Sequence, residues 1–194
     1  MKLTTTTWVT VDGVMQGLGG TDEDRRGGFE RGGWAMPYFD NEAATFLNQV
    51  YQRADAFLFG RRTYEIFAGY WGVMDPGSNP IAGALNTRPK FVASTTLTEP
   101  GWADTTVLSG DVAAAIGELK AKPAGELQVH GSGEFAYALA ERGLIDEYEI
   151  YLNPLVWGQG NVHVLGDRGT VRMQLDDVRR FESGVVLLTY LPAS

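Results

Sequence analysis

The spacing of apolar positions divides the chain into short strands and helices that alternate for most of its length. Short apolar or alternating runs predict strands at residues 3–11, 56–59, 90–94, 105–108, 127–130, 147–152, 171–181 and 185–191. Helical spacing predicts a helix from Asp40 or Asn41 onward, with Ala44, Leu47, Val50 and Tyr51 on one face, and helices at 61–67, 111–120 and 133–142. This order is typical of a three-layer α/β fold, with a mostly parallel central sheet, helices on both faces and an antiparallel C-terminal hairpin.

Two stretches lack such a pattern. Residues 18–33 are rich in glycine and charge and predict a long loop, which is either a mobile surface loop or a lid over a site. Residues 68–89 are rich in Pro and Gly and are expected to be irregular.

Composition limits the classes of protein to consider. The 194 residues are 44% hydrophobic, which suits a single domain over residues 1–194. A net charge of −8 argues against nucleic acid or an anionic membrane as a partner. Cysteine is absent, so disulfides and thiolate chemistry are excluded. The N-terminus lacks the features of a signal peptide and no run is long enough to span a membrane, so a cytoplasmic location is expected.

The first candidate site is the turn Gly131-Ser132-Gly133, which joins an apolar strand to a helix. The first N–H groups of a helix lack partners inside the helix, so such a junction can bind phosphate. The segment Gly131–Ala136 formally matches the dinucleotide pattern G-x-G-x-x-A. A Rossmann fold is not expected, because the motif comes late and the next strand ends in Asn153-Pro154 rather than an acid. A purely structural tight turn is the alternative.

Two further junctions carry anion-binding residue types. Gly60-Arg61-Arg62-Thr63 places two guanidinium groups at a helix N-terminus, where they oppose the helix dipole unless an anion is present. The alternative is that one arginine pairs with Glu65 or another acid. Ser94-Thr95-Thr96 places hydroxyls at the end of a strand, where open α/β sheets bind ligands. Together the three junctions predict a phosphorylated dinucleotide across the strand ends.

The motifs support a family resemblance over essentially the whole chain. They are GLIDEYEIYLNP at 143–154, VWGQG at 156–160, GRRTYE at 60–65, NTRPKFVAS at 86–94 and VDG at 11–13. On these motifs the chain resembles the dihydrofolate reductase superfamily, in the branch of the C-terminal reductase domain of the bifunctional riboflavin-biosynthesis deaminase-reductase. The resemblance implies a nine-stranded type of α/β reductase fold, NADPH as cofactor and a homodimer.

The resemblance also implies roles for the three junctions. Gly60, Arg61, Arg62 and Thr63 would hold the cofactor phosphates. Ser94 and Thr95, with one arginine, would read the 2′-phosphate and favour NADP over NAD. Gly131, Ser132 and Gly133 would receive the pyrophosphate, with Glu134 opening the helix. Reductases of this fold often have a cis Gly-Gly bond here, and Ser132 replaces the second glycine.

The substrate side departs more from the family pattern. The first-helix carboxylate of dihydrofolate reductases aligns near Ala44, so folate reduction is not expected, and the nearby Asp40 and Glu42 are interpreted as helix-start acids. Asp12 matches an aspartate that riboflavin-pathway reductases keep near the substrate, although a plain turn residue is an equal alternative. By similarity, the nicotinamide and substrate pocket would be lined by Trp8, Met15, Tyr38 and Tyr64, with core packing the favoured role of Trp8.

These residues predict an NADPH-dependent reductase that transfers hydride to a small heterocyclic or carbonyl substrate. The alternatives are 5-amino-6-(5-phosphoribosylamino)uracil reductase and a non-catalytic nucleotide-binding dimer. Neither His130 nor His163 has partners at ligand spacing, so no metal is expected. The pattern G-x-S-x-G is also absent.

Overall fold

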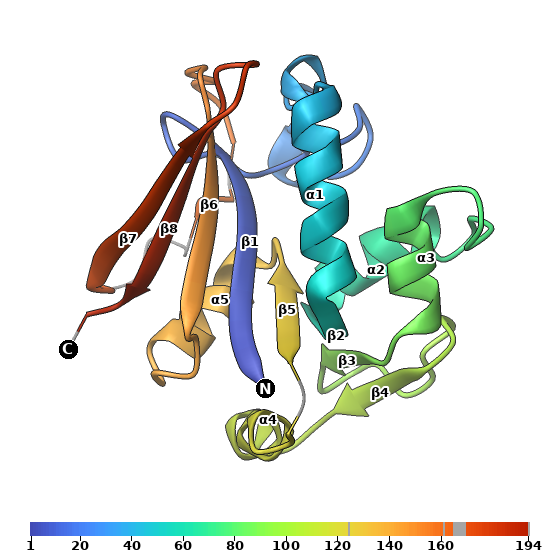
Figure 1. Cartoon of the computed structure of the whole chain (residues 1–194). Coiled ribbons are helices and arrows are strands. Elements are labelled where there is room, and N and C mark those ends of the chain that lie inside the picture. Colours follow the sequence, from blue (N-terminus) through green and yellow to red (C-terminus); the bar gives the residue numbers. More distant parts are fainter. Residues whose placement is uncertain (124, 161, 165–169, 194) are drawn as a thin grey trace.

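A computed structural model of the protein describes residues 1–123, 125–160, 162–164 and 170–193. These residues form an eight-stranded sheet with the order β4-β3-β2-β5-β1-β6-β8-β7, shown in Figure 1. The strands are β1 (Lys2–Thr10), β2 (Ala54–Gly60), β3 (Lys90–Ala93), β4 (Thr105–Leu108), β5 (Glu126–His130), β6 (Glu147–Asn153), β7 (Met173–Arg180) and β8 (Val186–Pro192). The pairs from β4 to β6 are parallel, and β8 is antiparallel to both β6 and β7. The predicted α/β class and its antiparallel C-terminal edge are confirmed, and the described residues do not form a ninth strand.

In the described part of the chain, five α-helices cover the two faces of the sheet (Figure 1). They are α1 (Asn41–Arg53), α2 (Arg61–Tyr70), α3 (Pro80–Thr87), α4 (Val112–Lys120) and α5 (Gly133–Ala140). One apolar cluster joins α1, α2 and α3 to β2 and β3 through residues such as Tyr51, Phe57 and Leu85. Another joins α4 and α5 to the opposite face through Ile116, Leu139 and Leu127. We call these the α1 face and the α5 face of the sheet. No described helix is long and apolar enough to cross a membrane.

The predicted long loop over residues 18–33 is present, but part of it belongs to the core. Phe29 and Trp34 are almost fully buried in a third apolar cluster, together with Trp8 and Tyr151 on the α1 face. The indole N–H of Trp34 donates to the backbone oxygen of Gln16 at 2.8 Å. Two short 3-10 helices, Arg26–Gly28 and Met36–Tyr38, are the regular structure between β1 and α1. The loop is therefore anchored by buried aromatic side chains rather than lying free on the surface.

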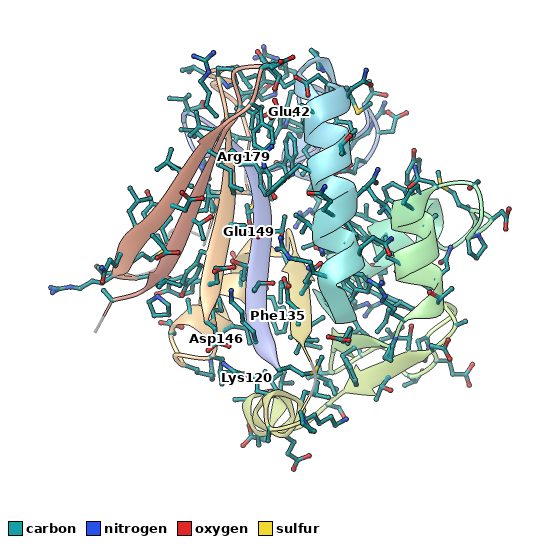
Figure 2. The ribbon with its side chains drawn as sticks, viewed as in Figure 1. Glu42, Lys120, Phe135, Asp146, Glu149 and Arg179 are labelled. Carbon is teal, nitrogen blue, oxygen red and sulfur yellow. The ribbon has the colours of Figure 1, made fainter. Side chains whose placement is uncertain are left out.

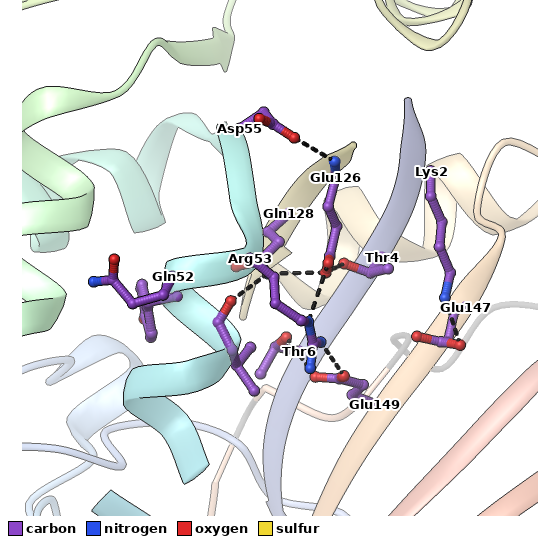
Figure 3. A network of polar contacts seen from close by, with 12 residues as sticks. Lys2, Thr4, Thr6, Gln52, Arg53, Asp55, Glu126, Gln128, Glu147 and Glu149 are labelled. Carbon is purple, nitrogen blue, oxygen red and sulfur yellow. Dashed lines mark hydrogen bonds and ion pairs between the residues drawn. The ribbon is translucent and has the colours of Figure 1, made fainter. Parts of the chain in front are cut away.

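A polar layer lies between the end of α1 and the sheet (Figure 3). At its centre Arg53, the last residue of α1, bonds Glu149 of β6 at 2.7 Å and Glu126 of β5 at 3.2 Å. Thr4 of β1 donates to Glu126 at 2.7 Å, and Gln128 donates to Glu126 at 2.8 Å. The layer thus ties the end of α1 to three adjacent strands.

The prediction of an irregular stretch between residues 68 and 89 is wrong for α3. Asn79 caps this helix, since its Oδ1 accepts from the N–H groups of Ile81 at 2.8 Å and Ala82 at 3.4 Å, and Pro80 occupies the first turn. At the other end, the buried ammonium of Lys90 donates to the carbonyls of Leu85 and Arg88, both at 2.8 Å. The helix is short but closed at both ends by side chains, and glycine and proline in the surrounding sequence obscured it.

Candidate cofactor site

The three predicted anion-binding junctions lie next to one another. Strands β3, β2 and β5 are consecutive in the sheet and parallel, so their carboxyl ends share one edge. The guanidinium of Arg61 bonds the hydroxyl of Thr96, which links the second junction to the third. The backbone N–H of Gly60 donates to the hydroxyl of Ser132 at 3.3 Å, which links the second junction to the first. The structure therefore brings the three predicted segments together.

The glycine turn has a backbone that requires small residues. Gly131 and Ser132 are both in the left-handed region, with φ of 59° and 57°. A Cβ on Gly133 would lie 2.8 Å from the backbone oxygen of His163 and 2.9 Å from the sulfur of Met15, so no side chain fits there. All described peptide bonds, including Gly131-Ser132, are trans. The turn thus presents bare backbone at the sheet edge, with Met15 packed directly against it.

Helix capping distinguishes the site helices from the others. Helices α1, α3 and α4 are capped by the side chains of Asp40, Asn79 and Asp111. The N-caps of α2 and α5 are Gly60 and Ser132, and neither makes a side-chain cap hydrogen bond. The first N–H groups of the two helices at the site are therefore left to another acceptor, and the helix dipoles favour an anion there.

The arginines of the second junction are on the surface. Arg61 forms an ion pair with Glu65 at 2.8 Å, as the alternative interpretation expected, and the two side chains are 45% and 50% exposed. Exposed pairs of this spacing contribute only about 0.3–0.5 kcal/mol, so an incoming phosphate can replace the carboxylate. Arg62 is exposed and forms no ion pair with the described residues. Both guanidinium groups are thus available at the N-terminus of α2.

In the third junction, Ser94-Thr95-Thr96, the three hydroxyl residues have different surroundings. The hydroxyl of Ser94 accepts from the N–H groups of Thr96 at 3.2 Å and Leu97 at 3.0 Å, so it shapes the turn. Thr95 is exposed beside it. Thr96, which the sequence placed in the same run without a separate role, is the residue that contacts Arg61. A long-range pair of this kind has no signal in the local sequence.

Asp12 connects two loops through its carboxylate. It accepts from the hydroxyl of Thr10 at 2.6 Å, from the N–H of Trp157 at 2.9 Å and from the N–H of Gly158 at 2.7 Å. These hydrogen bonds, that of Thr10 first, hold the pKa of Asp12 well below its usual range. The group is therefore an anion at neutral pH and has no proton to donate.

The four predicted pocket residues do not form one group. Trp8 is 7% exposed and stacks on Tyr151 with ring centroids 5.0 Å apart, which is the packing role favoured for it. Tyr38 packs against the same apolar cluster, while Met15 lies against the glycine turn. Tyr64 is buried elsewhere: its hydroxyl accepts from the N–H of Trp102 at 3.1 Å.

Tyr64 and Trp102 line a cavity of about 670 Å³ behind α2. Its other lining residues include Met74 and Leu97, but none from the glycine turn and none from Gly60–Thr63. No residue of the three junctions lines the cavity, but Glu65, the ion-pair partner of Arg61, and Leu97, whose N–H donates to Ser94, do. The cavity therefore lies next to the second and third junctions.

One histidine and three acids complete the predicted set. His130 is buried and stacks on Tyr51 with centroids 4.2 Å apart. Desolvation, and then the charge of Arg53, lower its pKa to about 3. Asp40 caps α1 and Glu42 lies in its first turn, as predicted, and Glu42 also pairs with Arg179 of β7 at 3.1 Å (Figure 2). Glu134 is exposed in the first turn of α5.

Comparisons with known proteins agree with this architecture. The chain is 24% identical over 184 residues to the uncharacterized protein YyaP of Bacillus subtilis, covering 94% of this chain and 90% of that protein. A Shewanella sp. PV-4 protein whose name assigns it to riboflavin biosynthesis superposes with a TM-score of 0.72 at 21% identity, over all of both chains. A pyrimidine reductase-like protein of Corynebacterium diphtheriae gives 0.67 at 14% identity, over 100% of this chain and 92% of that one.

The sequence also matches a family model. The model of the RibD C-terminal domain covers residues 1–187. Together with the fold, this match shows that the chain belongs to the RibD C-terminal domain family.

Proposed function

We propose that the protein is an NADPH-dependent reductase whose cofactor lies across the carboxyl ends of β3, β2 and β5. The observation that carries the proposal is the absence of side-chain caps on α2 and α5, whereas Asp or Asn side chains cap α1, α3 and α4. Two open helix N-termini at one edge suit the two phosphates of a dinucleotide. Membership of the RibD C-terminal domain family supports a reductase.

The residues at the edge fit an NADP phosphate better than an NAD hydroxyl. Arg61 and Arg62 supply two guanidinium groups, and Arg61 already reaches the hydroxyl run that follows β3. A guanidinium beside hydroxyls binds a phosphate dianion by charge-assisted hydrogen bonds. In this proposal Ser94, Thr95 and Thr96 border the 2′-phosphate, and the turn Gly131–Gly133 receives the pyrophosphate.

The protein contributes orientation and exclusion of water, while the bound cofactor supplies the hydride. Met15 packs against the glycine turn and so closes one side of the proposed nicotinamide position. Asp12 is held as an anion by three hydrogen bonds. We therefore assign Asp12 to loop positioning and derive the proton for the reduced substrate from water. A cytoplasmic location is part of the same proposal.

The substrate proposed is a small heterocycle or carbonyl compound without a phosphate. A phosphorylated ribosylaminopyrimidine, the substrate that the name of a solved Thermotoga maritima relative indicates, would need a basic patch. Of the loop arginines that could supply it, Arg26 pairs with Asp24, whose side chain is 8% exposed, and Arg31 lies over the ring of Trp157 at 4.3 Å. Arg25, in an exposed pair with Asp22, is a single cation and not a basic patch. The uracil reductase is therefore the second candidate. Turnover of its pyrimidine substrate by the purified protein would reverse this order.

Cofactor binding is tested by titrating the protein with NADPH and NADH and following nicotinamide fluorescence. We expect tighter binding of NADPH, and Arg61→Ala should weaken NADPH binding by about 10- to 100-fold because it removes a charge-assisted hydrogen bond. Ser94→Ala should weaken it less, and neither change should alter NADH binding by as much. Arg142→Ala, at the far end of α5, is the matched control and should leave both affinities unchanged. Absence of NADPH binding, or equal losses for both nucleotides, would refute the assignment.

Catalysis is tested separately from binding. Oxidation of NADPH is followed at 340 nm with pterins, pyrimidines, quinones and small carbonyl compounds as acceptors. Turnover of at least one acceptor is expected. Tight NADPH binding without turnover of any acceptor would instead identify a non-catalytic nucleotide-binding protein.

A further inference from the structure

The cavity behind α2 has no role in the function proposed above. It is lined by α2, by residues between 72 and 76, by Asn86 of α3 and by the connection between β3 and β4. Its volume of about 670 Å³ is within the range of small-molecule sites, which is roughly 300–1,000 Å³. The cavity is therefore large enough to bind a ligand of its own.

Much of the cavity wall is apolar. The aromatic and aliphatic side chains that line it are those of Tyr64, Ala68, Val73, Met74, Leu97 and Trp102. An apolar ring placed against such a wall removes apolar surface of both partners from water, which favours binding. The wall therefore suits a ligand with an aromatic or other apolar body.

One buried polar side chain of the wall retains a free donor. The amide of Asn86 is engaged, because its NH₂ group donates to two carbonyls and its Oδ1 accepts from the indole N–H of Trp102 at 2.7 Å. The hydroxyl of Tyr64, a residue that is 3% exposed, accepts from the backbone N–H of Trp102 at 3.1 Å. None of the described residues accepts its proton. Tyr64 can therefore donate a hydrogen bond to a ligand.

Glu65 gives the cavity its charge. It is the only charged side chain among the lining residues, which are all in the described part of the chain. Its Oε1 accepts from the guanidinium of Arg61 at 2.8 Å, and none of the described residues bonds its Oε2. The protein as a whole has a net charge of −8. Both the local and the overall charge therefore favour a cation over an anion as the ligand.

We propose that this cavity binds an organic ammonium ion with an aromatic body, and that its occupation strengthens binding of the cofactor. The ring would lie against Tyr64 and Trp102, and an oxygen or nitrogen acceptor on it would take the proton of Tyr64. The ammonium group would pair with Glu65 by a charge-assisted hydrogen bond. This assignment of the ligand uses the apolar wall, the free donor and the carboxylate together.

The coupling to the cofactor follows from the two contacts that the cavity shares with the junctions. An ammonium ion on Glu65 competes with Arg61 for the carboxylate, which releases the guanidinium for a cofactor phosphate. Leu97 of the cavity wall also donates its N–H to the hydroxyl of Ser94 at 3.0 Å. By linkage, the cofactor must strengthen binding of the amine by the same factor. The coupling rests on the proposed function, whereas binding of the amine does not.

The first test is a titration with 4-methoxyphenethylamine in the absence of nucleotide. It is followed by proton–nitrogen correlation spectra, in which the indole N–H of Trp102 reports on the cavity and is identified by its loss in Trp102→Phe. We expect this signal to shift with the amine. The uncharged analogue 2-(4-methoxyphenyl)ethanol should bind about 3- to 10-fold more weakly, because it lacks the charge that pairs with Glu65. An unchanged Trp102 signal, or equal affinities of the two compounds, would overturn the proposal.

Variants then locate the bound amine. Glu65→Gln should reduce the affinity for the amine to that for the alcohol. Ala68→Phe fills the cavity from α2 and should prevent binding of both compounds. Glu118→Gln, on the exposed side of α4, is the matched control and should change neither affinity. Unchanged amine affinity in Glu65→Gln, or in an Ala68→Phe protein with a native circular dichroism spectrum, would place the amine elsewhere and refute the site.

The second test measures the coupling. NADPH is titrated by its fluorescence with and without saturating amine, and the wild type should bind NADPH about 2- to 5-fold more tightly with the amine, because the exposed pair that is released is weak. Glu65→Gln should show no such effect. Weaker binding of NADPH would mean that the cavity holds part of the cofactor, and an unchanged affinity would refute the coupling. The first titration contains no nucleotide, so it decides on the amine site even if the protein binds no NADPH.

Discussion

His130 is a basic side chain next to the candidate site that carries no charge. It is 4% exposed, packs against the rings of Tyr51 and Phe57, and bonds the amide oxygen of Gln128 at 2.9 Å. Burial, together with the positive charge of Arg53, lowers its pKa to about 3. His130 is therefore a packing residue next to the glycine turn, and it does not act as an acid or a base at neutral pH.

This pKa predicts a loss of stability in mild acid. The unfolded chain binds a proton at His130 below its ordinary pKa of about 6.5, whereas the folded protein does not until the pH nears 3, so folding is penalised as the pH falls from 6.5. Between pH 7 and pH 5 this group should lower the free energy of unfolding by about 2 kcal/mol. Urea unfolding at the two pH values measures the loss. His130→Gln should lack this component, and an equal acid loss in both proteins would contradict the assignment.

Some residues of the candidate site could be singled out from the local sequence alone. Gly131 and Gly133 stand out in the sequence because glycines at a strand–helix junction leave the backbone open to a ligand. Arg61 stands out because a cation at a helix N-terminus opposes the helix dipole. Contacts between distant segments were not predictable. The pair of Arg61 with Thr96 and the stacking of Trp8 on Tyr151 depend on how the strands are ordered, which no local pattern encodes.

At the scale of the elements, helix α3 shows that a helix-start signal and nearby loop-forming residues can give opposite predictions. Asn79-Pro80 is a good helix start, but Pro and Gly residues on both sides made the region resemble a loop. At the other end, the ammonium of Lys90 donates to carbonyls of the last turn and of the residue that follows the helix. These hydrogen bonds form only in the folded chain, so the local sequence does not indicate them. The longer, more periodic helix α1 was predicted with its N-cap Asp40, because its apolar stripe and capping residue agree.

The cap of α3 gives a prediction at this scale. Asn79→Ala removes the acceptor of the N–H groups of Ile81 and Ala82 and should lower the free energy of unfolding by about 0.5–2 kcal/mol. Asn79→Asp keeps an acceptor at the N-terminus and should lose much less. Urea denaturation at neutral pH compares the two variants. If both variants lost the same stability, the side-chain cap would not be the cause.

At the scale of the molecule, the strand order was the part of the fold that the sequence did not disclose. Alternating strands and helices predicted a mostly parallel sheet, and the hairpin predicted its antiparallel edge. The insertion of β5 between β2 and β1 brings the glycine turn beside the arginine junction. This insertion depends on long-range pairing. The same pairing places Glu126 and Glu149, which are far apart in sequence, on either side of Arg53.

The Arg53 network should therefore hold α1 to the sheet in a pH-dependent way. The Glu149 side chain is 6% exposed, and desolvation raises its pKa although Arg53 opposes this. Arg53→Met leaves this carboxyl without its cation, and we expect a loss of about 2–3 kcal/mol, less than for a fully buried pair because Arg53 is 42% exposed.

The loss in Arg53→Met should depend on the protonation of Glu149. Without the cation, the folded-state pKa of Glu149 rises further above that of the unfolded chain. The neutral acid is tolerated in mild acid, and stability is lost as the pH rises through the folded-state pKa. Urea unfolding at pH 5 and pH 8 should thus show a larger deficit at pH 8. Glu149→Gln in the Arg53→Met background should abolish the difference, while Arg142→Met, an exposed control, should change stability by less than about 0.5 kcal/mol. An equal deficit at both pH values would mean that Arg53 acts through packing of its aliphatic stem and not through its charge.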